Sequence, residues 1–395
     1  MPEGRTIPGL RNDKSISESE LLRQTAQEIL SGAGARDRDP AFPEEPFGLL
    51  ARGGFLALPL RGAALPESVS SADGKSGGGF FAGEWRVLRE VARADGSVGR
   101  VLDGHFNGVE RVSLLAPEPL RSAEIEGIRA GELRLGVWGA DPIPGEGEPA
   151  RLVRRSGETR LSGVKTFCSG AGGLHRALVA VRGEGGEPGP PHLAYVDLTD
   201  GSGYGVDRSW YRSSGMRSSE SHRVVFDGAR VLAVLGEPGE LVREPYFSRD
   251  AIRTAVSWAG ISDLARDAAL KTLAAKSGPG GPDDLASVAA GRMIAHSGTM
   301  DRWLLDAADR ADNGPRRLAG AYAVALRQAV ASACRALLDE AVRACGSHPF
   351  ATAGPLDRAK RDLELILLQH RLEPALARAG RRAIESVGGS SEPGS

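Results

Sequence analysis

The chain has 395 residues, of which 41% are hydrophobic and 26% are charged. This ordinary composition excludes a wholly disordered or fibrous chain, and the length predicts two or three folding units. Its 50 basic and 51 acidic side chains leave a net charge of -1, which argues against a broad electrostatic attraction to nucleic acid or to an anionic membrane.

Cysteine usage and the absence of long apolar runs predict a soluble cytoplasmic protein. Cys168, Cys334 and Cys345 are too few and too widely spaced for a disulfide framework or a zinc site, and they fit a reducing compartment. The N-terminus lacks the apolar segment of a signal peptide, and no apolar run approaches the roughly 18 to 20 residues that span a bilayer. The seven histidines are scattered, so no metal centre is predicted.

Residues 16–131 are predicted to form an N-terminal helical domain that follows a disordered tail at residues 1–15. Leu21, Leu22, Ala26 and Ile29 recur at helical spacing in the first helix. Ser17 can cap that helix, with Glu20 completing a capping box, and Gly32 and Gly34 are expected to end it. A proline-broken linker is expected over residues 35–48, and a loop over residues 65–83.

The sequence pattern changes at residue 132, and residues 132–240 are predicted to form a middle β domain. Short runs rich in valine, leucine and aromatic residues are separated by Gly, Pro or Asp turns, a pattern typical of antiparallel strands in a sandwich or barrel. A hairpin turn is predicted at Ser156 and Gly157.

Residues 241–388 predict a C-terminal bundle of four long helices, followed by a disordered tail at residues 389–395. Asp283 or Asp284 is expected to open the second helix, Gly346 to end the third, and Pro374 to kink or split the fourth. The resulting fold class is α+β. The order of helices, then strands, then helices argues against a doubly wound α/β fold.

Four short sequence segments follow one another along these predicted domains. They are GVWGADPIPG after the first predicted strand, LSGVKTFCSGAGG, WYRSSGMRSSES before the last strand, and CGSHPF followed by PLDRAKRDLELILLQH. Together with the three-part order they resemble the acyl-CoA dehydrogenase superfamily of flavoproteins. The resemblance implies a bound flavin, FAD or alternatively FMN, and a homodimer or homotetramer assembled through the bundle.

The resemblance also implies cofactor-binding residues. A flavin ring needs flat apolar walls and a few fixed hydrogen bonds. Trp138 and Phe167 can supply walls, and Ser169 matches the family position whose hydroxyl hydrogen-bonds the ring. Gly346 lies in the segment that matches the family's glycine-rich turn. Phe167 could instead be plain core and Ser169 a turn residue. Arg217 is a candidate for contact with a substrate or cofactor phosphate, or else a surface-loop residue.

The catalytic glutamate of the family is missing. Its position, the tenth from Arg361, is His370 here, and the alternative position near the start of the first bundle helix shows Ile252 and Arg253. His370 shares a helical stripe with Leu363, so it is either a buried packing residue or a base over the flavin.

A histidine near the position of His370 is similar to one found in flavin-dependent monooxygenases of the same superfamily. The members that oxidise dibenzothiophene also carry a histidine in the helix before the β domain and an FCSG-like segment. Here these correspond to His105, which could equally pack between helices, and to Phe167–Gly170. The family's pattern for holding the FAD pyrophosphate is absent, although Lys271 or Arg292 could substitute for it.

Three functions follow from these observations. The first is a flavin-dependent oxidoreductase acting on an acyl or acyl-thioester-like small molecule, with a separate electron acceptor. The second is a monooxygenase that uses oxygen and reduced flavin from a flavin reductase, with His105, Ser169 and His370 around the flavin. The third is a degenerate, non-catalytic homologue that serves as a scaffold or subunit partner.

Overall fold

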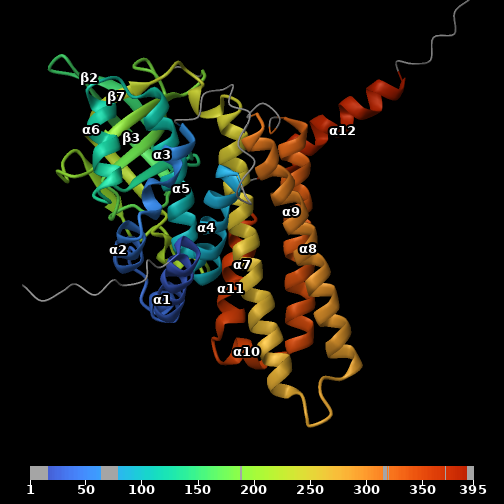
Figure 1. The fold of residues 1–395 in the computed structure, drawn as a ribbon. Helices are drawn as coiled ribbons and strands as arrows, with labels where there is room; N and C mark the ends of the chain where they lie inside the picture. Colours follow the sequence, from blue (N-terminus) through green and yellow to red (C-terminus); the bar gives the residue numbers. More distant parts are fainter. Residues whose placement is uncertain are drawn as a thin grey trace, which may run out of the picture.

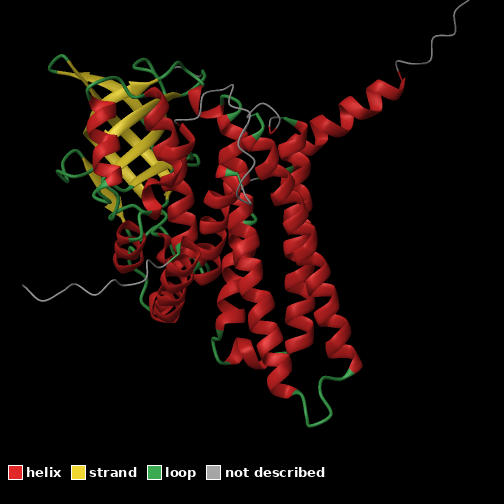
Figure 2. Cartoon of the chain, in the orientation of Figure 1, coloured by secondary structure: helices red, strands yellow, loops and turns green. Residues whose placement is uncertain are grey.

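A computed structural model describes residues 17–63, 79–186, 189–314, 318, 320–369 and 371–388. A curled sheet with helices packed on it lies beside a group of long helices (Figures 1 and 2). The predicted α+β fold, with an N-terminal helical region, a central sheet and C-terminal helices, is confirmed. No helix in the described part of the chain combines the length and the apolar character needed to cross a membrane.

Six α-helices and a short 3-10 helix precede the sheet in the described residues. They are α1 (Glu18–Arg38), α2 (Glu44–Arg52), η1 (Phe55–Ala57), α3 (Leu58–Ala63), α4 (Phe80–Ala94), α5 (Gly96–Leu115) and α6 (Leu120–Arg129).

The first helix is longer than the sequence predicts. The Ser17 side chain accepts a hydrogen bond from the Glu20 amide at 3.2 Å, as expected of the cap. The helix then continues through both glycines to Arg38, because its apolar face stays buried as far as Ala33. Packing therefore outweighs the low helix propensity of glycine, and α1 and α2 occupy most of the predicted linker at 35–48. Of the predicted loop at 65–83, residues 65–78 lie outside the described residues, and α4 begins at Phe80.

Seven strands form one bent sheet in the order β1-β4-β5-β7-β3-β2, with β6 also paired to β7. They are β1 (Leu135–Trp138), β2 (Arg151–Arg155), β3 (Glu158–Cys168), β4 (Arg176–Val181), β5 (His192–Asp197), β6 (Tyr204–Asp207) and β7 (His222–Leu235).

The long strand β7 holds the sheet together, because one part of it pairs with β5 and another with β3 and β6. The predicted hairpin joins β2 to β3 through Ser156 and Gly157, both at positive φ (52° and 82°), the backbone that a two-residue hairpin favours. The prediction of purely antiparallel strands was wrong at one edge, where β1 pairs with β4 in parallel. Strands β2 and β3 lie between β1 and β4 in the chain, which gives the long crossover connection that a parallel pair needs.

The C-terminal helices in the described residues are α7 (Tyr246–Lys276), α8 (Asp284–Asp312), α9 (Ala321–Cys345), α10 (His348–Ala351), α11 (Pro355–Ile366) and α12 (Glu373–Gly388). Asp283 caps α8 through the Ala286 amide at 2.8 Å, as predicted. The predicted fourth helix is two helices, because α11 ends at Ile366 and α12 begins just before Pro374. Proline fits the first turn of a helix, where its missing N–H is not needed. Helix α12 points away from the bundle (Figure 1).

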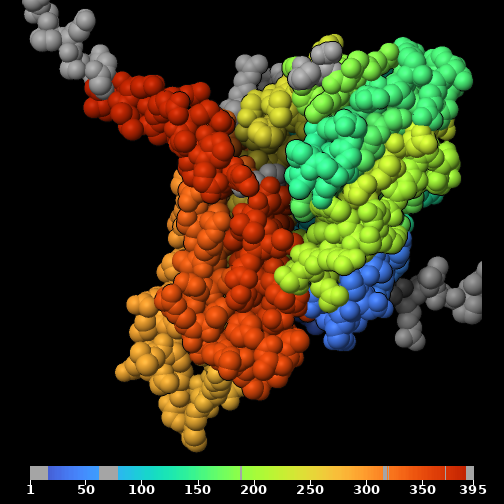
Figure 3. Space-filling view, turned by 180° about the vertical axis from the view of Figure 1, so that it is seen from behind, coloured from blue at the N-terminus to red at the C-terminus, as the bar shows by residue number. Residues whose placement is uncertain are grey.

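Helix α5 joins the two halves of the molecule. It packs on β1 and on α7, and sixteen of its twenty residues are buried, from Gly96 to Val112. On the opposite side, the loop before β7 meets α11, where the Met216 amide donates to Asp362 at 2.5 Å. Seen from behind, the sheet half, in greens, lies directly against the helical half, in oranges and reds (Figure 3). The functional cavity lies in this junction.

Candidate functional site

A cavity of about 640 Å³ lies where the sheet meets α5, α7, α9 and α11. Most of its lining is apolar, with polar groups on both sides, and its size is typical of small-molecule sites. The residues on the sheet side are Val137, Gly139, Ala140, Phe167, Ser169, Tyr211, Met216, Ser219, Ser221 and Leu241. Those on the helical side are Arg100, Gly104, Asn107, Phe247, Asp250, Ala251, Thr254, Arg327, Leu365, Ile366, Leu368 and Gln369.

Phe167 forms an aromatic wall on the sheet side. Its side chain is 55% exposed, although it sits at the end of a largely buried strand. A positive φ of 51° turns its backbone out of the strand, and its ring rests edge-on against Trp210, with centroids 4.9 Å apart. The alternative of a plain core residue is therefore excluded for Phe167.

A row of three serine hydroxyls lies beside this aromatic ring. Ser169 Oγ is 2.9 Å from Ser221 Oγ, which is 2.8 Å from Ser219 Oγ, and all three residues line the cavity. Trp138 stands behind this row: it is 1% exposed, and its indole N–H donates to the Ser169 carbonyl at 3.0 Å. The prediction that Trp138 forms a cavity wall was therefore wrong, because the indole supports Ser169 from the core instead.

A buried lysine fixes the loop that follows β1. Lys165 Nζ donates to the Gly139 carbonyl at 3.1 Å and to Asp141 Oδ1 at 2.7 Å. Burial lowers the pKa of Lys165, while the carboxylate of Asp141 favours its charged form. Gly139 and Ala140 of this loop expose little but backbone to the cavity, so a flat ligand can approach closely there.

Helix α7 presents one regular face to the cavity. Phe247, Asp250, Ala251 and Thr254 line it, at the spacing of three and four residues that places side chains on one side of a helix. Arg100, Gly104 and Asn107 do the same from α5.

Asp250 is the cavity-lining carboxylate in the described residues. Its Oδ2 accepts from Arg111 Nη2 at 2.7 Å, whereas its Oδ1 is buried without a hydrogen-bond partner. Burial raises the pKa of Asp250 to about 7, because it penalises the charged form more than the nearby arginines favour it. The group can therefore exchange a proton near neutral pH.

Sequence reasoning missed Asp250 because it counted to Ile252 and Arg253. Ile252 is two residues from Asp250, which on a helix is a rotation of about 200°, and neither Ile252 nor Arg253 lines the cavity. Arg253 is fully buried and paired with Glu84 at 2.7 Å and Glu110 at 3.0 Å. The useful signal was helical periodicity: Asp250 lies four residues before Thr254 and three after Phe247.

His105 is enclosed by backbone groups rather than by the cavity. Its Nδ1 accepts from the Leu135 amide at 3.1 Å, and its Nε2 lies 3.0 Å from the Leu56 carbonyl. These partners assign the proton to Nε2 of a neutral ring, and burial lowers the pKa of His105 to about 4. With both nitrogens occupied and the side chain absent from the cavity lining, the arrangement favours the packing role over the catalytic one.

The other predicted residues are dispersed. His370 lies outside the described residues, although Leu368 and Gln369, just before it, line the cavity. The stripe predicted to run from Leu363 to His370 on one helix is interrupted, because α11 ends at Ile366. Arg217 lines a separate polar pocket and donates to the Asp37 carbonyl at 2.6 Å.

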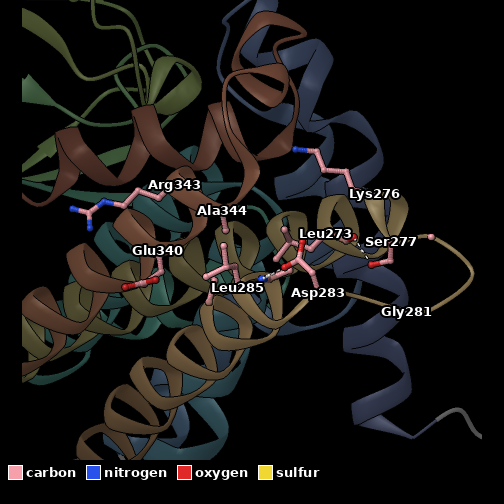
Figure 4. Close-up of a pocket in the computed structure, with 12 residues that line it drawn as sticks. Leu273, Lys276, Ser277, Gly281, Asp283, Leu285, Glu340, Arg343 and Ala344 are labelled. Atoms are coloured by element: carbon pink, nitrogen blue, oxygen red, sulfur yellow. Dashed lines mark hydrogen bonds between the residues drawn. The ribbon is translucent and has the colours of Figure 1, made fainter.

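Gly346 ends α9 with a φ of 68° at the far end of the bundle. A third pocket, of about 590 Å³, lies near that end, between α7, the start of α8 and α9 (Figure 4). Glu340 and Arg343 of α9 and Lys276 of α7 are among the residues that line this pocket. Arg292 pairs with Glu340 at 3.4 Å, whereas Lys271 is exposed. The structure does not bring Gly346 to the cavity that Phe167 and Ser169 line.

The cavity has the features that a flavin ring requires. Phe167 and Val137 provide apolar walls, the serine row provides hydroxyl partners, and the loop at Gly139 provides close backbone approach. The residues present therefore fit the group.

Similar structures are known. TdsC, the dibenzothiophene monooxygenase of Paenibacillus sp. A11-2, solved with FMN and indole, is 20% identical and aligns over 93% of this chain and 97% of its own, with a TM-score of 0.75. Butyryl-CoA dehydrogenase from Megasphaera elsdenii is 16% identical over 94% of this chain and 99% of its own, with a TM-score of 0.77. The nitrososynthase of Micromonospora carbonacea var. africana is 22% identical over 93% and 95%, with a TM-score of 0.73.

At these identities the likeness establishes a common fold. No protein-family model and no curated protein matches the chain.

Proposed function

We propose that this chain, which has the acyl-CoA dehydrogenase fold, is a flavin-dependent oxidoreductase that acts on an acyl or acyl-thioester-like small molecule. The observation that carries the proposal is the placement of Asp250 across one cavity from Phe167 and Ser169. A carboxylate that can hold or release a proton thus faces an aromatic and hydroxyl-rich surface suited to a flavin.

In this proposal each side of the cavity has its own task. Phe167 and the loop at Gly139 would hold the ring of FAD or FMN, and the Ser169 hydroxyl would orient it. A bound flavin supplies hydride or electron transfer. Asp250 Oδ1, which lacks a partner, would accept the proton from the substrate carbon next to the carbonyl. Its pKa of about 7 suits a general base at neutral pH.

The position of Asp250 is held by surrounding charges. Arg111 is 1% exposed and binds Oδ2, while Oδ1 is buried and has no hydrogen-bond partner. Arg253 lies 3.7 Å from Oδ1, too far for a hydrogen bond, and is itself committed to Glu84 and Glu110. The carboxylate is therefore oriented through one oxygen, and no hydrogen-bond donor is committed to the other.

The first test is a visible absorption spectrum of the purified chain, desalted after addition of FAD or FMN in separate samples. Retained flavin absorbance supports the proposal, and the cofactor that is retained more strongly, FAD or FMN, is the one that the protein uses. Ser169→Ala should weaken retention, whereas Ser202→Ala, in an exposed turn of the sheet half, should leave it unchanged. The absence of bound flavin under all conditions favours the non-catalytic scaffold.

A second candidate is a monooxygenase that uses reduced flavin and oxygen. It is favoured by the Phe167–Gly170 segment, whose aromatic ring and Ser169 hydroxyl both line the cavity, and by the likeness to TdsC. Oxygen consumption that depends on an added flavin reductase supports this candidate. Reduction of an artificial electron acceptor by substrate alone, without oxygen uptake, supports the dehydrogenase.

A further inference from the structure

Arg327 stands apart from the other charged groups of the cavity. It projects from α9 into the lining, and its Nε and Nη2 are buried without hydrogen-bond partners. Among the described residues, no carboxylate lies within ion-pair distance of its guanidinium; all ion pairs that reach the cavity involve other residues.

The neighbouring charges show how unusual this is. Arg100, also in the lining, donates to Asp103 at 2.9 Å. Asp103 is in turn saturated, because it also accepts from Asn107 at 3.1 Å and from Thr254 at 3.0 Å. Asp250 has Arg111. Asp103 favours the charge of Arg327 from a distance, but among the described residues no carboxylate pairs directly with this guanidinium.

The guanidinium remains charged and is held in place. Its Cζ lies 5.6 Å from the centre of the Trp258 ring, which is fully buried beneath it, so a cation–π contact fixes the plane of the group. Burial lowers the pKa of Arg327 to about 10, which still leaves it protonated at neutral pH. A desolvated cation without a partner is unfavourable, and an anion entering the cavity would relieve that cost through charge-assisted hydrogen bonds.

We propose that the substrate carries an oxyanionic group, such as a carboxylate, that pairs with Arg327 while its apolar body lies against Leu365, Ile366 and Val137. The inference rests on the proposed function, because it takes this cavity to be the substrate site. It narrows the substrate class to small amphiphilic anions: an acyl chain or ring with one anionic end. The anion and Asp250 would occupy different walls, α9 and α7, so the same molecule can meet both.

The test is direct binding of matched probes to the full chain at pH 7, by isothermal titration calorimetry. Hexanoate and octanoate are compared with hexanamide and octanamide, which have the same shape without the charge. The carboxylates should bind at least tenfold more tightly than the amides. Arg327→Gln should abolish that preference and leave amide binding unchanged, whereas Arg327→Lys should keep part of it.

Arg335→Gln is the matched control, because Arg335 lies on the same helix and is exposed; it should bind like the unmodified chain. The proposal is overturned if neither carboxylate binds, if carboxylates and amides bind equally, or if Arg327→Gln retains the preference.

Flavin absorbance, recorded on the same samples, separates the two claims. A carboxylate preference without retained flavin would support the anion site at Arg327 and contradict the proposed flavin-dependent function. Retained flavin without a carboxylate preference would support the proposed function and overturn the anion site. Loss of flavin in Arg327→Gln alone would assign the guanidinium to the cofactor and overturn the substrate inference.

Discussion

Asp250 is the proposed base, and the burial of its carboxylate predicts an activity that depends on pH. Because burial raises its pKa to about 7, the basic form predominates only above that pH, so kcat/KM should rise as the pH increases from 6 to 8. Asp250→Asn should lower turnover by about 10²- to 10⁴-fold and remove this rise, while flavin absorbance stays normal. Turnover of Asp250→Asn within threefold of the unmodified chain would dismiss it as the base.

Asp362 predicts an effect on stability instead. Burial raises the pKa of Asp362 to about 7, although the hydrogen bond that its carboxylate accepts from the Met216 amide acts in the opposite direction. Between about pH 4 and 7 the unfolded chain has released this proton and the folded chain keeps it, so stability falls as the pH rises, by up to about 1.4 kcal/mol per pH unit. Asp362→Asn, always neutral, should lack this contribution.

The measurement is urea unfolding of both proteins from pH 4.5 to 7.5. The stability of Asp362→Asn relative to the unmodified chain should increase with pH and level off above about 7. Parallel pH curves for the two proteins would show that the carboxyl group titrates alike in the folded and unfolded states.

At the level of single residues, sequence reasoning succeeded where the local backbone decides and failed where three-dimensional direction decides. Phe167 and Ser169 were predicted from the resemblance of their segment to the flavoprotein family, and both line the cavity at the end of β3. Trp138 points into the core whereas its neighbour Val137 lines the cavity, because successive residues of a strand alternate between faces. Asp250 was missed through a shift of two helical positions, and Arg327 lies in an alanine-rich stretch that gives no sign of a site.

Between elements, the crossing of α7 on α4 depends on a glycine. A Cβ placed on Gly260 of α7 would lie 2.4 Å from the Arg89 carbonyl and 2.8 Å from Ala92 Cβ, both on α4. Gly260→Ala should therefore destabilise the fold by about 2 kcal/mol or more, as overpacking does. Gly291 of α8 has nothing within 4 Å, so Gly291→Ala should stabilise it by about 0.5–1 kcal/mol through helix propensity.

Thermal unfolding of the two variants checks this pair, with circular dichroism at 222 nm as the signal. Similar shifts in both variants would mean that the α4–α7 contact yields readily. The sequence predicted these helices well: α8 and α9 each bury one long stripe, while α7 is buried on all sides from Ala251 to Ala265. It predicted the ends of α1 and α11 poorly, because those depend on partners far away in the chain.

For the whole molecule, assembly through the bundle remains a prediction. Ile294 and Leu305 on α8 are 60% and 63% exposed, and their separation of eleven residues places them on the same side of the helix. The double variant Ile294→Glu/Leu305→Glu should have a lower molar mass by light scattering coupled to gel filtration. Ile384→Glu, on the equally exposed α12, should not; a shift in this variant alone would move the contact to α12.

Two polar contacts that tie the N-terminal helices to helices made much later constrain folding during synthesis. Arg361 of α11 binds Asp37 of α1 at 2.6 Å, and Asp312 of α8 accepts from the Phe81 amide at the start of α4. A ribosome releases α1 and α4 hundreds of residues before these partners. Helices α1, α4 and α5 can pack on one another early, but the part of α4 that packs on α7 and α8 must wait, exposed, until those helices are made. This chain should therefore depend on chaperones that shield nascent helices, and it should tolerate loss of its last helix far better than loss of α11.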